Sequence, residues 1–224
     1  MTLSTRDLAR AIALATGLCD LMLARGGPRG QQASGLRRAA ARFQANLETG
    51  FRQATLGRAI AALFDTALAA GVSAAAFRAV REAAAAASAP DEPAAWTRRA
   101  FRRQALVAEA LRLAGATFTD RDSVEAARAG LIEAFDDLAE DASQIGDFVV
   151  MADLMALAAA IQRHLSATAM PLPRIVTYET PASLPSLVLA QRLYADPSRR
   201  RELELQNRVA HPLFMPAAGS GLSS

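Results

Sequence analysis

The sequence predicts a mainly α-helical protein: a multi-helix bundle body followed by a small C-terminal α+β module. Apolar residues make up 52% of the 224 residues, which is enough for a hydrophobic core, whereas aromatic residues make up only 5%. The core must therefore consist mostly of Ala, Leu, Val and Ile, which suits closely packed helices. Apolar residues recur at spacings of three and four as far as residue 170, and a β-branched run follows at 175–178.

Four helices are expected before residue 90. Ser4 and Asp7 form a candidate capping box for the first, which should end by Gly26-Gly27-Pro28. The second and third patterns run to Gly50 and Gly71, and Ser73 caps the fourth. The apolar positions, in chain order, are Leu8, Ile12, Ala15, Leu18 and Met22; Leu36, Ala40, Phe43 and Leu47; Ile60, Phe64 and Leu68; and Phe77 and Val80.

An arginine-rich helix follows the stop signal Pro90-Asp91-Glu92-Pro93. Spacings of three and four place four of its arginines on one face, namely Arg98, Arg99, Arg102 and Arg103. Such a face could bind phosphates or an acidic partner, or it could be solvated and neutralised by local ion pairs. No aromatic platform interleaves with these arginines, so a protein contact is favoured over a DNA contact.

Two further helices should form an antiparallel hairpin, because only Gly146-Asp147 separates them. The first has a continuous apolar stripe and an acidic remainder, Glu133 to Asp141, which we interpret as a solvated or arginine-pairing face. The second is apolar over a wide surface and should be buried against several neighbours. Its richest stretch, Phe148 to Ile161, contains Asp153, so we expect no membrane-spanning helix, which needs about 20 apolar residues.

The C-terminal segment changes character. Arg174 to Glu179 suits a short strand, and a helix should follow from about Ser183. Asp196 should cap a second short helix that ends at Asn207, before an extended tail and a return strand. This order resembles a LysM-like module. We therefore expect three regions: a helical region at 1–115, the helical hairpin at 116–170 and the module at 171–224.

Several motifs occur in a fixed order from residue 122. The first three are an acidic helix, a Gly-Asp break and a Leu/Ala-rich helix. They are followed by Leu172-Pro173 before a strand, a helix that begins near Leu184-Pro185 and ends at Tyr194, then Asn207, and finally His211, Pro212, Phe214 and Pro216. This order resembles the C-terminal part of Mu-type phage tail proteins of the "DNA circularisation" (or "DNA circulation") family. The resemblance implies a structural subunit of a contractile tail, in the baseplate at the junction of hub and tube.

The resemblance also implies partners and a location. We expect contacts with hub, tube and wedge subunits, several copies around the tail axis, and residence in the virion after assembly in the host cytoplasm. The arginine face and the acidic face could pack one copy against the next. The candidate interface residues are Arg98, Arg99, Arg102, Arg103, Leu184, Pro185, Tyr194, Asn207, His211, Pro212, Phe214 and Pro216.

No residue pattern indicates catalysis. The sequence has no phosphate-binding glycine loop, no metal-ligand spacing and no supported triad, so we expect no enzyme activity, cofactor or metal. His164 and His211 are the two histidines and fit helix-surface and turn positions. Cys19 is the one cysteine and is expected to be a buried thiol. Asp7 and Asp20 flank the apolar N-terminal segment and argue against a signal peptide or lipid anchor.

Two alternatives remain open. A LysM-like module could bind peptidoglycan, although few aromatic residues are present. A DNA-associated role would follow from the arginine content and the family name. All 25 basic residues are Arg, but 22 acidic residues reduce the net charge to +3, so nucleic-acid binding is not expected to be its function.

Overall fold

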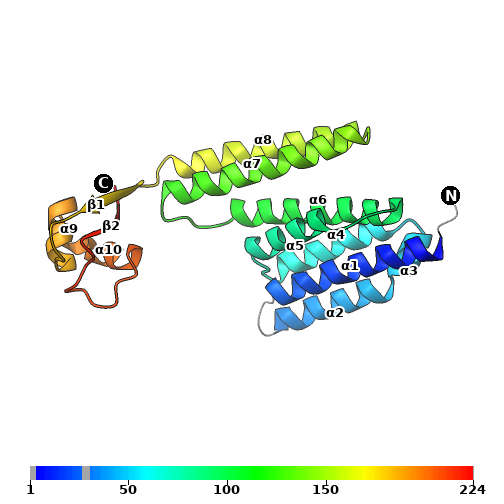
Figure 1. Ribbon diagram of the computed structural model, residues 1–224, viewed down its shortest axis with the longest axis horizontal. Coiled ribbons are helices and arrows are strands. Elements are labelled where there is room, and N and C mark those ends of the chain that lie inside the picture. Colours follow the sequence, from blue (N-terminus) through cyan, green and yellow to red (C-terminus); the bar gives the residue numbers. More distant parts are fainter. Residues whose placement is uncertain (1–3, 27–30, 224) are drawn as a thin grey trace. The chain divides into compact units, whose positions relative to one another are not determined.

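The computed structural model describes residues 4–26 and 31–223, so the predicted end of the first helix at Gly27-Pro28 lies outside the described residues. Within those ranges the chain forms ten α-helices and one two-stranded sheet, which confirms the mainly helical fold class (Figure 1). The helices are α1 (Thr5–Gly26), α2 (Gln31–Ala45), α3 (Leu47–Arg52), α4 (Leu56–Ala69), α5 (Ala74–Ala86), α6 (Glu92–Ala114), α7 (Arg121–Gln144), α8 (Phe148–Ala169), α9 (Ser186–Tyr194) and α10 (Arg200–Gln206).

The chain divides into two compact units. The first, which we call the body, comprises Met1–Ala116 and Leu131–Ile161; the second comprises Thr117–Gly130 and Gln162–Ser224. The dividing points fall within α7 and α8, so each of these helices contributes residues to both units. Below, "the module" means the part of the second unit from Ile175 onward.

The core of the body lies where α1, α2, α4, α5 and α6 pack side by side (Figure 1). Phe101 of α6 lies between two other rings, with centroids 6.1 Å from Phe43 and 5.8 Å from Phe64. The stripe predicted for the first helix faces this core, since Leu8, Ala15, Leu18 and Met22 are all buried. Cys19 is buried beside them, as expected, and this burial, with a smaller effect of Asp20, raises the pKa of its thiol to about 12.

The residues at which helices begin and end are set by local hydrogen bonds more than by the spacing of apolar residues. The second predicted helix is broken at Asn46, whose side-chain amide donates to the Arg42 carbonyl at 2.7 Å. A short polar side chain that bonds to the backbone competes with helix continuation. Ser73 caps α5 as predicted, because its hydroxyl accepts from the Ala76 amide at 3.2 Å. Asp91 caps α6 in the same way.

The helices α7 and α8 run antiparallel across a three-residue connection, and Arg128 of α7 donates to the Ser166 hydroxyl of α8 at 3.0 Å (Figure 1). The predicted stripe of α7 is largely buried. The prediction for α8 was wrong: Leu154, Ile161 and Leu165 are buried, but Phe148, Val149 and Met155 are exposed. By length and composition alone, α8 could cross a membrane, so the presence of Asp153 does not exclude a membrane span. Core helices of soluble proteins share this length and composition.

The module has the predicted strand–helix–helix–strand order. Its strands β1 (Ile175–Glu179) and β2 (Ala218–Leu222) pair antiparallel, with Ile175 opposite Leu222 and Glu179 opposite Ala218. Between them lie α9, a single 3-10 turn at Pro197–Arg199, and α10. A small separate core fills the space under the sheet and consists of Tyr178, Leu189, Ala190, Leu203 and Met215.

Candidate protein-interaction sites

The arginine face of α6 is used largely within the chain. The side chain of Arg102 is only 8% exposed, and its guanidinium binds both Asp137, at 2.5 Å, and Asp141 of α7. Arg103 pairs with Asp147 at 3.2 Å. For Arg102, this is the local ion pairing that the arginine pattern allowed, and it forms because the carboxylates of α7 lie within reach.

The other two predicted arginines differ from each other. Arg99 donates to the Glu92 carboxylate about two turns earlier on α6, at 2.5 Å. Arg98 forms no ion pair in the described part of the chain, and its Nε is buried without a hydrogen-bond partner. Of the four arginines, Arg98 is thus the one without an ion pair to a described residue.

The sequence did not predict two further charged contacts of α6. The Glu109 carboxylate is 1% exposed and accepts from Arg78 at 2.7 Å and from Arg81 at 3.0 Å, both on α5. Arg112 donates to the carbonyls of Leu68 and Val72 at 2.7 and 2.8 Å. These carbonyls lie at the C-terminal end of α4, where a cation is favoured by the helix dipole. The charges of α6 therefore join α4, α5 and α7 to it.

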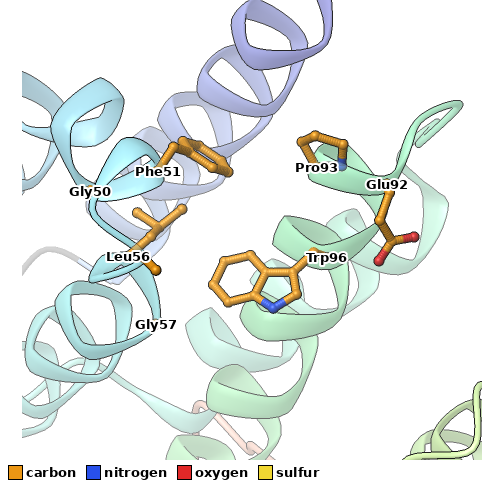
Figure 2. Close-up of a pocket in the computed structure, with 8 residues that line it drawn as sticks. Gly50, Phe51, Leu56, Gly57, Glu92, Pro93 and Trp96 are labelled. Atoms are coloured by element: carbon orange, nitrogen blue, oxygen red, sulfur yellow. The ribbon is translucent and has the colours of Figure 1, made fainter. Parts of the chain in front are cut away.

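An apolar hollow of about 380 Å³ opens beside Trp96, between the turn from α3 to α4 and the first turn of α6 (Figure 2). Figure 2 shows Phe51, Leu56, Pro93 and Trp96 around it. Gly57 also lines the hollow, and a Cβ there would lie in ordinary van der Waals contact with the indole ring, at 3.6 Å. Glu92 is the one ionisable residue in the lining. The hollow can hold an apolar group but has no acid–base pair.

Two residues predicted for an interface form hydrogen bonds inside the module. The Asn207 side chain donates to the carbonyls of Leu203 and Ser220, at 2.8 and 2.7 Å, and accepts from the Ser220 amide at 2.9 Å. The Tyr194 hydroxyl accepts from the Leu222 amide at 3.0 Å. Burial is the largest influence on this phenol and raises the pKa of Tyr194. Both side chains attach β2 to the helices.

The glycines of β2 make this attachment possible. A Cβ at position 219 would lie 2.6 Å from the Tyr178 hydroxyl and would clash with Asn207 Oδ1, and a Cβ at 221 would clash with the Tyr194 hydroxyl. The alternation of glycines at 219 and 221 is the sequence signal that could have shown this, since one face of β2 must lie against bulky side chains.

The remaining predicted residues gather at two adjoining loops, which we call the loop cluster: 180–185, before α9, and 208–217, after α10. The Ser186 amide donates to the Pro212 carbonyl at 2.7 Å, and the Met215 amide donates to the Leu184 carbonyl at 3.0 Å. Pro185 is the N-cap of α9. The rings of His211 and Phe214 are in contact at a tilt of 44°, with centroids 5.6 Å apart, and Phe214 is 69% exposed. Pro216 is exposed beside them. The loop cluster thus presents an aromatic side chain to solvent.

No three His, Cys, Asp or Glu residues lie together as a metal site anywhere in 4–26 or 31–223. Comparison of the chain with models of known protein families and with curated proteins gave no match.

Proposed function

We propose that this chain is a non-enzymatic structural subunit of a contractile phage-type tail, located in the baseplate at the hub and tube junction, and that it attaches to neighbouring subunits through the loop cluster. The motif order from residue 122 to Pro216, with its resemblance to the "DNA circularisation" tail proteins, carries this proposal. Neighbouring hub, tube and wedge subunits are the partners, and several copies surround the tail axis.

Two features of the chain support a role in protein contacts. The exposed side chains Leu213 and Phe214 lie on loops that hydrogen bonds hold to α9, so they are presented with little loss of conformational freedom on binding. Exposed aromatic anchors of this kind often supply most of the binding free energy at an interface. The charges on α6, by contrast, are mostly bound within the body.

The test is incorporation into particles. Tail particles from the source should be fractionated on a density gradient, and mass spectrometry should find this chain at a fixed ratio to tube and sheath proteins. Phe214→Ser should abolish incorporation, while Leu111→Ser, which changes an exposed apolar residue on α6, should not. Absence of the wild-type chain from intact particles would contradict the proposal.

A second candidate function is peptidoglycan binding through a LysM-like module. The observation that favours it is the order β1, α9, α10, β2 with antiparallel pairing of the two strands. A pulldown on purified peptidoglycan separates the two candidates. Retention that Phe214→Ser abolishes would favour the glycan role, and loss of the chain to the supernatant would leave the tail proposal in first place.

A further inference from the structure

Arg201 on α10 and Arg208, two residues after α10 ends at Gln206, form no ion pair with a described carboxylate, unlike most of the arginines on α6. Arg201 and Arg208 line a hollow of about 500 Å³ together with Leu205, Val209 and Glu204. Both arginines are exposed and neither forms an ion pair with any other residue that the structure describes. One oxygen of the Glu204 carboxylate, Oε1, accepts a hydrogen bond from the Ser186 hydroxyl at 2.6 Å. Leu205 is 78% exposed at this hollow, so an apolar side chain lies between two unpaired cations.

The backbone at Arg208 is held in an unfavourable conformation. Its φ is 50°, in the left-handed region, because it follows the last turn of α10. The Val209 amide donates to the Glu204 carbonyl at 3.0 Å, and the Arg208 amide donates to the Leu205 carbonyl at 3.2 Å. Glycine usually occupies this position at a helix end, because a Cβ costs free energy there. The residue in this strained conformation is one of the two arginines that line the hollow.

A complementary surface lies on α7, within the body. Glu133, Asp136 and Glu140 are exposed and spaced three and four residues apart, so they share one helix face. None of them forms an ion pair in the part of the chain that the structure covers, although Glu140 accepts a neutral hydrogen bond from Gln144 at 3.3 Å. We call these three residues the acidic face of α7. Arg102 neutralises the neighbouring Asp137 and Asp141 instead.

We propose that α10 of one copy docks on the acidic face of α7 of a second copy. Arg201 lies on α10 and Arg208 lies two residues after its end at Gln206, and both line the same hollow, whereas Glu133 and Glu140 share one face of α7. The contact therefore places two cations opposite the acidic face of α7, and it also removes Leu205 from water. The two surfaces are different, so the contact is head-to-tail and repeats from copy to copy, giving a ring or a filament.

This inference deepens the proposed function, because it names the surfaces by which copies meet, and it rests on that function for its biological setting. Its test uses the purified full chain without any tail protein. Failure of self-association and failure of particle incorporation are therefore separate results.

Self-association should be followed by light scattering during gel filtration, over a range of protein concentrations, at low and high salt. The wild-type chain should associate with rising concentration, and high salt should weaken the association by screening exposed charges. The double variant Arg201→Glu/Arg208→Glu should associate about tenfold more weakly or worse. Glu133→Arg/Glu140→Arg should behave in the same way, because each variant places like charges opposite one another.

Mixing the two charge-reversed variants supplies the decisive measurement. Association should return in the mixture, which also shows that both variants fold. The control Arg37→Glu/Arg38→Glu changes the net charge as Arg201→Glu/Arg208→Glu does, but on exposed residues of α2. It should associate like the wild type. A wild-type chain that stays monomeric at all concentrations would overturn the proposal, as would reversal without effect or mixing without recovery.

Discussion

The arginines of α6 and the pair Arg201 and Arg208 have the same side chain but different surroundings in the folded chain. On α6, Arg102 and Arg103 each reach a carboxylate of the body, so their charges stabilise the packing of helices. Arg201 on α10 and Arg208 just after it form no ion pair with any described residue and stay exposed beside Leu205. The difference shows that what lies within reach after folding, rather than residue type, decides whether a charge supports the fold or remains for a partner.

The largest effect should come from the most deeply buried charge of the body. Glu109→Ala removes the shared partner of Arg78 and Arg81, whose side chains are 45% and 17% exposed, and losing these charge-assisted hydrogen bonds should cost about 3 kcal/mol. Urea unfolding followed by the fluorescence of Trp96 measures the change. Glu92→Ala on the exposed end of the same helix should cost less than about 1 kcal/mol. An equal loss of stability from Glu109→Ala and Glu92→Ala would show that the burial of Glu109 does not make its ion pairs more stabilising.

The corresponding polar residue of the module is Asn207. Asn207→Ala removes two donated bonds and one accepted bond and leaves the Ser220 groups unpaired, which should destabilise the module by about 2–3 kcal/mol. Hydrogen exchange at the amides of β2 is the measurement, since β2 should open first. Gln206→Ala, one position earlier, is the matched control and should leave the exchange rates unchanged.

A direct comparison of the two arginine groups follows from alanine substitution. Arg102→Ala should destabilise the body by about 2 kcal/mol, because it leaves Asp141 partly buried without its cation, although Asp137 is exposed to solvent. Arg201→Ala should change the stability of the module by less than about 0.5 kcal/mol. Thermal unfolding of both variants tests the pair. A stability loss from Arg201→Ala as large as that from Arg102→Ala would contradict the distinction.

The smallest expected effect is a gain in the stability of the module. Arg208→Gly relieves the left-handed backbone and should stabilise the module by up to about 1 kcal/mol, while it weakens self-association of the chain. Calorimetry and light scattering on the same sample measure the two changes. Ala54→Gly relieves a similar backbone strain in the body, at φ 56°, and should stabilise it without changing self-association.

Much of the fold could be predicted from the sequence because apolar spacing identifies a helix face whatever covers it. The stripe of α1, the cap at Ser73 and the order of elements in the module follow from spacing and local chemistry. The break at Asn46 could not be predicted, because the apolar period continues through it. The exposure of Phe148 was missed for a related reason, since a pattern shows which residues are apolar but not which neighbours cover them.

The candidate sites were harder to predict than the fold. Arg102 and the α7 carboxylates were each recognised as charged surfaces, but their pairing depends on tertiary packing that spacing does not contain. Asn207 and Tyr194 came from the motif order alone, and the structure places their hydrogen bonds inside the module. The hollow at Arg208 depends on a backbone conformation that the residue type argues against.

The buried thiol of Cys19 makes this chain convenient for site-directed labelling. It is the one cysteine in the sequence, and burial keeps it protonated and away from maleimide reagents near neutral pH. A second cysteine introduced on the surface would therefore carry a fluorophore selectively, without removal of the natural one. A dye at position 37, on α2, lies outside the proposed contact and would follow assembly of the copies in real time.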